Sequence, residues 1–118
     1  MDKPTKTGNA KEKRRWQRFT GLSNPMAEVK LVGSPICQLK ILDLSEKGAS
    51  IVVRSDSSFL KMIEVGQEVN VRLVLPKDYR GPSGHYRSKI EHITETQESP
   101  FRGHMVVGLS FISRINSL

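Results

Sequence analysis

At 118 residues, with 36% hydrophobic and 26% charged side chains, the chain has the size and composition of one soluble domain. Its apolar runs are far shorter than the roughly 20 residues that a membrane-spanning helix needs, so we expect no span and a cytoplasmic protein. The net charge of +7 is uneven, because residues 1–20 hold seven Lys or Arg and two acidic residues, whereas residues 21–118 hold twelve and ten.

This basic segment precedes the first stretch that looks able to fold. We expect residues 1–12 to be a disordered leader and residues 13–25 to be an arm that carries Arg14, Arg15 and Arg18. Positive charge concentrated beside a nearly neutral body favours an arm that meets an anion. A solvated tail that aids solubility is the alternative.

Alternating apolar and polar side chains predict six short strands in the body of the chain. They are expected over 26–32, 37–41, 49–53, 66–75, 85–93 and 105–111. Ile90 and Ile93 fall on opposite faces of a regular strand, which predicts a bulge between them. Cys37 has no partner for a disulfide and is expected to be a buried small hydrophobe.

The stretch between the third and fourth strands is typical of one helical turn or a loop. We expect Phe59, Met62 and Ile63 to face inward from it. Six strands with one helical interruption predict an all-β fold, a small antiparallel β-barrel over residues 26–112 followed by a short C-terminal tail.

Catalytic and metal sites have no clear sequence signal. The histidines His85, His92 and His104 lack metal-ligand spacing and are interpreted as scattered surface or packing residues. Ser58 and Lys61 match S-x-x-K by chance, since the elements that accompany it in acyl-transferring enzymes are missing. No phosphate-binding glycine loop is present. We therefore expect neither an enzyme nor a resident cofactor or metal.

The segment DLSEKG (43–48) interrupts the strand pattern with polar residues. On an extended strand Asp43 and Ser45 would share one face and Leu44 would point the other way. Gly48 would allow a positive φ in the turn into the next strand. From the residues alone, this segment is a hairpin turn whose Asp and Ser bond the local backbone.

The segments RRWQR (14–18) and DLSEKG (43–48), in this order, resemble the R-x-x-x-R and [D/N]-x-S-x-x-G signatures of the PilZ domain family. VGLSF (107–111) is similar to the closing strand of that family, so the resemblance covers residues 13–112. Neither motif lacks a family position here. The resemblance implies a single PilZ-like domain over 13–118 that acts as a bacterial receptor for the second messenger cyclic di-GMP.

Arginine suits such a ligand, because its planar guanidinium can grip phosphate, bond guanine O6 and N7, or stack on a base. The resemblance implies that Arg14 and Arg18 hold guanines and phosphates as a flexible arm closes over the barrel, with Arg15 assisting. It also implies that Asp43 accepts hydrogen bonds from guanine N1–H and the N2 amino group. Ser45 would bond a base or phosphate, and Gly48 would let the ligand approach the backbone.

Two other classes of function stay open. A small barrel with a basic arm could bind nucleic acid, although the nearly neutral body, poor in aromatics at 6% of the chain, argues against it. A PilZ-like adaptor that binds proteins without using the ligand is the other. For a receptor we expect an unidentified downstream effector protein, and either one ligand molecule or two stacked ones.

Overall fold

Strands form where the sequence alternates apolar and polar side chains. The computed structural model describes residues 17–18, 25–77, 79, 81–97 and 100–118. In that part of the chain the 3-10 helix η1 (Ser58–Met62) lies between the fourth and fifth strands. The strands are β1 (Gln17–Arg18), β2 (Met26–Lys30), β3 (Cys37–Leu44), β4 (Gly48–Val53), β5 (Glu68–Val74), β6 (Gly84–Glu95) and β7 (Met105–Ile115).

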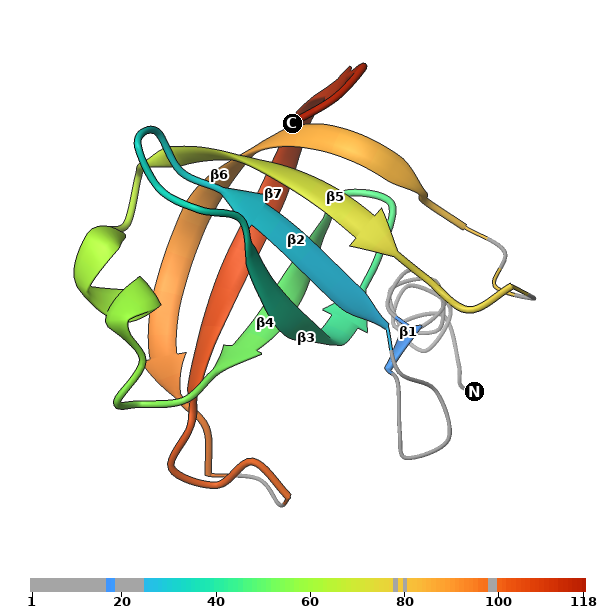
Figure 1. The fold of residues 1–118 in the computed structure, drawn as a ribbon. Helices are drawn as coiled ribbons and strands as arrows, with labels where there is room; N and C mark the ends of the chain where they lie inside the picture. The colour runs from blue at the N-terminus through green and yellow to red at the C-terminus, as the bar shows by residue number, and fades with distance from the viewer. Residues whose placement is uncertain (1–16, 19–24, 78, 80, 98–99) are drawn as a thin grey trace, which may run out of the picture.

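Strands β2 to β7 close into an antiparallel barrel (Figure 1). The order along the sheet is β1-β3-β2-β5-β6-β7-β4, and β4 returns to pair with β3. Closure gives every barrel strand a partner on both sides, which removes the exposed edges of an open sheet. The predicted six-stranded all-β barrel is confirmed, and β1 is an additional strand that the sequence pattern did not predict.

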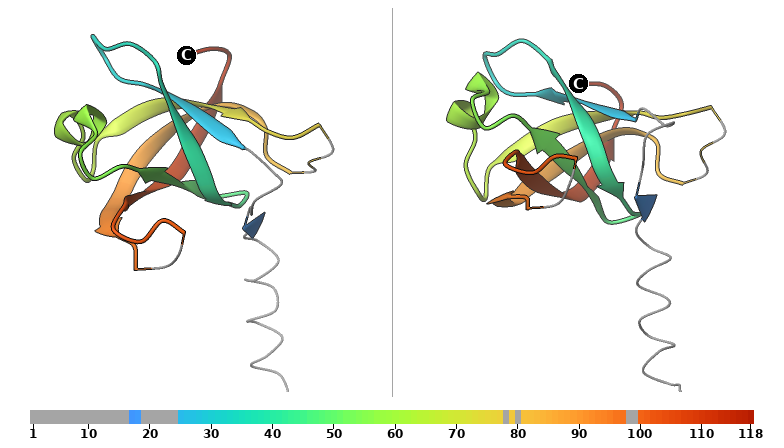
Figure 2. Two further views of the ribbon diagram at one scale, coloured as in Figure 1. Left: turned by 60° about the horizontal axis from the view of Figure 1, so that its bottom comes forward. Right: turned by 90° about the horizontal axis from the view of Figure 1, so that it is seen from below.

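The two ends of the barrel differ. Helix η1 lies at one end, where the side chain of Ser57 accepts a hydrogen bond from the backbone N–H of Phe59 at 3.2 Å. Strand β1 lies at the opposite end, beside the turn from β3 to β4 (Figures 1 and 2). The two elements that interrupt the barrel pattern are therefore kept apart by its full length.

The inward-facing side chains fill the barrel with aliphatic groups. Fully or almost fully buried are Ala27, Val29, Ile41, Leu44, Ile51, Val53, Val69, Val71, Ile90, Val107 and Leu109. Burial of a Val, Leu or Ile side chain is worth about 1.5 to 3 kcal/mol each, so this core is the main favourable term for folding. The outer face carries charged pairs such as Arg72 with Glu28, whose N···O distance is 2.7 Å.

Bulges adjust which residues face the core. On β6, Ile90 pairs with Leu109 and His92 with Gly108, so Glu91 is an extra residue on β6. This bulge confirms the one predicted between Ile90 and Ile93. Both isoleucines turn inward because of it, Ile90 fully buried and Ile93 packed against the core.

Three expectations about side chains are wrong. Met62 is 40% exposed, because η1 turns Phe59, Leu60 and the following Ile63 toward the core. Cys37 is half-buried and packs at the edge of the core, since it begins β3 at the end of the barrel. The first barrel strand ends at Lys30 and not at residue 32, which leaves Val32 fully exposed in the turn toward β3.

A buried hydroxyl group in the described part of the barrel gives a testable prediction about stability. Among the described residues, the hydroxyl of Ser88 on β6 is a buried polar atom that has no hydrogen-bond partner. Since an unsatisfied buried polar group costs about 1 to 3 kcal/mol, we expect Ser88→Ala to raise the free energy of unfolding by about 1 kcal/mol. Urea unfolding monitored by circular dichroism measures the change. Ser113→Ala, at an exposed position on β7, should change it by less than about 0.5 kcal/mol. A loss of stability in Ser88→Ala would contradict the prediction.

Candidate functional site

The two sequence motifs meet at the end of β3. Strand β1 pairs with β3 in the register Gln17 opposite Leu44 and Arg18 opposite Asp43. The second arginine of R-x-x-x-R is therefore the backbone partner of the motif aspartate on the neighbouring strand. Arg14 and Arg15 lie outside the described residues.

Strand β1 uses an edge of β3 that β2 leaves open. Strand β2 pairs along residues 37–40 of β3, and β1 pairs with the next part of the same edge. Strand β4 pairs on the other edge. The final residues of β3 thus have a partner on both sides, and the arm reaches the motif by pairing its backbone with the sheet.

A bulge turns Asp43 away from the core. Ile41 pairs with Ile51 and Asp43 pairs with Ser50, so Leu42 is an extra residue on β3. A regular strand would put Asp43 on the face of Ile41, which is fully buried. With the extra residue, Leu44 takes the inward position and Asp43 is half-buried on the outer face. The bulge therefore keeps the carboxylate of Asp43 out of the barrel core.

Ser45 belongs to the turn and does not extend the strand. Its backbone N–H donates to the carbonyl of Gly48 at 2.9 Å, and its hydroxyl accepts from the N–H of Lys47 at 3.1 Å. The side chain is 3% exposed. The expectation that Asp43 and Ser45 share one face is wrong, because β3 ends at Leu44 and its two-residue period ends there. The hairpin-turn interpretation holds for Ser45.

Gly48 is required for close packing and not for a left-handed turn. It is absent from the described glycines that have positive φ, so the expectation of a positive φ is wrong. A Cβ built on Gly48 would overlap the backbone carbonyl of Leu109 on β7. The carbonyl of neighbouring Lys47 accepts a hydrogen bond from the N–H of Phe111 at 2.8 Å. The glycine thus brings the motif turn against β7.

A row of directly paired residues runs from β1 across the barrel wall to β6. Successive partners are Arg18 with Asp43, Asp43 with Ser50, Ser50 with Gly108, and Gly108 with His92. Directly paired residues share one face of a sheet. This row crosses five strands, and its four interstrand steps of about 4.8 Å span roughly 19 Å. A ligand of dinucleotide size could follow it.

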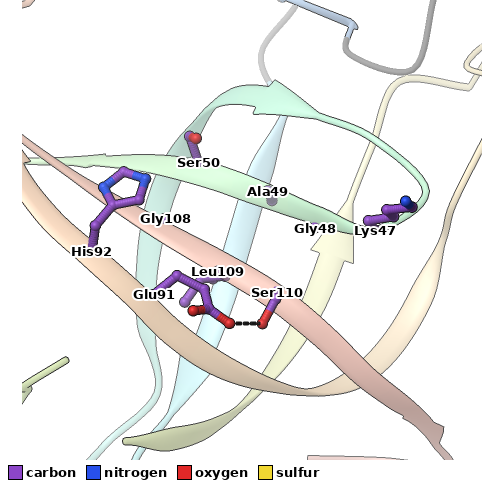
Figure 3. Close-up of a pocket in the computed structure, with 9 residues that line it drawn as sticks. All are labelled: Lys47, Gly48, Ala49, Ser50, Glu91, His92, Gly108, Leu109 and Ser110. Carbon is purple, nitrogen blue, oxygen red and sulfur yellow. Dashed lines mark hydrogen bonds between the residues drawn. The ribbon is translucent and has the colours of Figure 1, made fainter. Parts of the chain in front are cut away.

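A shallow hollow of about 230 Å³ lies beside this row on β4, β6 and β7 (Figure 3). The outward residues of β4 and β7 here are small, since Gly48 and Ser50 alternate with buried Ala49 and Ile51. The hollow is lined by Lys47, Gly48, Ala49, Ser50, Glu91, His92, Gly108, Leu109 and Ser110.

Two polar side chains of β6 border the hollow. A carboxylate oxygen of Glu91 accepts a hydrogen bond from the hydroxyl of Ser110 at 2.6 Å. The ring of His92 lies over Gly108, where any Cβ would overlap it (Figure 3). Sequence reasoning missed both residues as site candidates. A usable signal was the repeated Gly-x-Ser at 48–50 and 108–110, which indicates two strands with small residues on one face.

The described residues give no metal site and no membrane-spanning helix. Within the described ranges, no group of three or more His, Cys, Asp or Glu side chains is placed to hold a metal ion. A search of the same ranges finds no helix long and apolar enough to cross a membrane.

Comparison with known proteins identifies the fold. No protein-family model matches the sequence, and no curated protein matches it either. The barrel nevertheless has a PilZ-like fold. The chain is similar to the PilZ domain with c-di-GMP of YcgR from Escherichia coli, with a TM-score of 0.58 and 14% sequence identity. The match covers 85% of this chain and 78% of that chain. At this identity the likeness concerns the fold.

The packing of Gly48 can be tested by substitution. Gly48→Ala would force apart β4 and the backbone of β7, so we expect it to lower the free energy of unfolding by about 2 kcal/mol or more. Gly33 is the control, since its φ is +76° but no atom lies within 4 Å of a Cβ built there. Gly33→Ala should lower the free energy of unfolding by about 1 kcal/mol, the backbone cost alone. Equal losses in urea unfolding would contradict the role given to Gly48.

Proposed function

We propose that the protein is a cyclic di-GMP receptor that holds the dinucleotide between its basic arm and the segment 43–48. The observation that carries this proposal is the register of β1 on β3, in which Arg18 is the direct partner of Asp43. A guanidinium that can bind phosphate or guanine and a carboxylate that can accept from guanine thus belong to neighbouring strands. The fold likeness to a PilZ domain with c-di-GMP supports the same ligand.

The remaining motif residues have supporting roles in this proposal. Arg14 and Arg15 add positive charge to the arm and bind the phosphates and bases with Arg18. Ser45 fixes the turn that follows Asp43, through its bond to the N–H of Lys47. Gly48 keeps that turn against β7, so the ligand meets a wall without protruding side chains.

Signalling follows from closure of the arm. A ligand that bonds both β1 and the barrel favours the conformation in which the two are paired, by the difference in its affinity for the paired and unpaired forms. The paired arm and the adjoining barrel wall then present a surface that a downstream effector protein recognises. Calorimetric titration with cyclic di-GMP tests the binding step and gives its stoichiometry. Titration with single-stranded oligonucleotides tests the nucleic-acid alternative, and no heat from either ligand would favour an adaptor.

The arginines of the arm should contribute strongly to affinity. Arg14→Ala or Arg18→Ala each removes a charge-assisted contact to an anion, so we expect each to weaken cyclic di-GMP binding by about 2 kcal/mol or more. Isothermal titration calorimetry measures the loss. Arg54→Ala is the control, because Arg54 is exposed and pairs with Asp56 in the loop ahead of η1. Wild-type affinity in both arm variants would contradict the proposed site.

Asp43 should distinguish guanine from adenine. Guanine presents adjacent N1–H and N2 amino donors to a carboxylate, whereas adenine has an acceptor at N1 and no amino group at C2. We expect the wild type to prefer cyclic di-GMP over cyclic di-AMP by about 1 to 3 kcal/mol per base. Asp43→Ala should weaken cyclic di-GMP binding and shrink this preference. Competition titrations decide it, and an undiminished preference in Asp43→Ala would mean that the base is read elsewhere.

A further inference from the structure

The hollow on β4, β6 and β7 lies in line with the motif aspartate and has polar chemistry of its own. Ser50, which lines it, is the backbone partner of Asp43 on one side and of Gly108 on the other. His92, which also lines it, is the partner of Gly108 on the far side. The hollow is thus the continuation, along the same outer face, of the row that begins at Arg18.

Its floor suits a flat, extended ligand. The outward residues on β4 and β7 are Gly48, Ser50, Gly108 and Ser110, so backbone and hydroxyl groups form the floor, and the ring of His92 covers it at Gly108 (Figure 3). The ring of His92 is exposed where it lies over Gly108, so its outer aromatic face is open to a ligand. Purine bases stack on such faces in nucleotide-binding proteins.

Glu91 is the acidic residue that lines the hollow at this end of the row. It is the bulge residue of β6 and is exposed. Its Oε2 atom accepts a hydrogen bond from the hydroxyl of Ser110 at 2.6 Å. An ionised carboxylate has about four lone-pair sites, so the bond to Ser110 orients the group and leaves acceptor capacity. The same bond directs the exposed Glu91 carboxylate toward Ser110, which also lines the hollow (Figure 3).

A carboxylate in this position has the wrong charge for an anion site. It repels phosphates, and the protein otherwise favours anions with a net charge of +7. It has the right chemistry for the edge of guanine, whose N1–H and N2 amino groups are both donors. Asp43 on β3 and Glu91 on β6 therefore stand as two guanine acceptors, one on each side of the small-residue floor.

We propose that Glu91 reads the second guanine of the bound dinucleotide, as Asp43 reads the first, with His92 stacking on the base. This inference rests on the proposed function and adds to it the residues that determine specificity at the second base. The ligand then lies across β3, β4, β7 and β6, and not at the arm alone. Asp43 and His92 are three interstrand steps apart, roughly 14 Å, a span suited to a molecule with two bases.

The experiment compares three ligands that differ only in their bases: cyclic di-GMP, mixed cyclic GMP–AMP and cyclic di-AMP. The wild type should bind them in that order, with roughly tenfold loss for each guanine replaced. Glu91→Gln should weaken cyclic di-GMP roughly tenfold, because an amide donor replaces an acceptor opposite the guanine donors. The mixed ligand should bind Glu91→Gln almost as tightly as it binds the wild type, because it can turn its adenine toward Gln, which pairs with adenine. The preference for cyclic di-GMP over the mixed ligand therefore collapses.

The direction of the change in affinity shows whether Glu91 recognises a base or only contributes charge. Glu91→Gln removes a negative charge, so a site that merely attracts phosphates would bind every ligand more tightly. Glu64→Gln is the matched control, since Glu64 is exposed in the loop between η1 and β5, and it should leave the ligand order unchanged. A second variant, Ser50→Leu, fills the floor and should weaken all three ligands together, whatever their bases.

The outcomes are distinguishable from failure of the proposed function. If the wild type binds cyclic di-GMP and Glu91→Gln binds it equally or more tightly, the role of Glu91 is overturned and the receptor function stands. Full affinity in Ser50→Leu would likewise overturn occupation of the hollow. If the wild type does not bind cyclic di-GMP, the receptor function and this inference both fall. Thermal unfolding of each variant confirms that any loss of binding is not a loss of fold.

Discussion

The closure of the barrel through β3 is the constraint on which the rest of the structure depends. This strand pairs with β4 on one edge and with β2 and then β1 on the other, so its backbone is held along its whole length. A strand that serves three partners must bend, and the extra residue Leu42 provides the bend. The same residue changes which side chains face inward. The outward placement of Asp43 is thus a result of this one backbone irregularity.

The glycines adapt this closed wall to its neighbours. Gly48 lets the turn after β3 approach the carbonyl of Leu109, and Gly108 makes room for the ring of His92. Because both positions lack a side chain, the outer surface of β4 and β7 carries only the hydroxyl groups of Ser50 and Ser110 and the ring of His92 over Gly108. Asp43 and Glu91 lie on β3 and β6, the two strands that flank that surface.

The sequence predicted the parts of this structure that depend on local periodicity. The barrel strands follow from two-residue alternation, and the bulge on β6 follows from apolar residues at Ile90 and Ile93. The same spacing occurs at Ile41 and Leu44 on β3, where the polar motif obscured it. The structural role of Gly48 was misread, because one sequence does not distinguish a left-handed turn from close approach to a distant strand. His92 was set aside because its position beside the motif depends on pairing between strands far apart in sequence.

Strand β1 also has a consequence for competition at the sheet edge. It is joined to β2 by residues 19–25, although the positions that the two strands occupy on β3, Asp43 and Lys40, are only about 10 Å apart. A short tether of this kind keeps the arm at an effective concentration on the order of millimolar near its own docking position. A foreign peptide that offered a strand to the same edge would have to exceed that concentration or bind more tightly than β1. This part of the β3 edge is therefore already occupied by a segment of the chain itself.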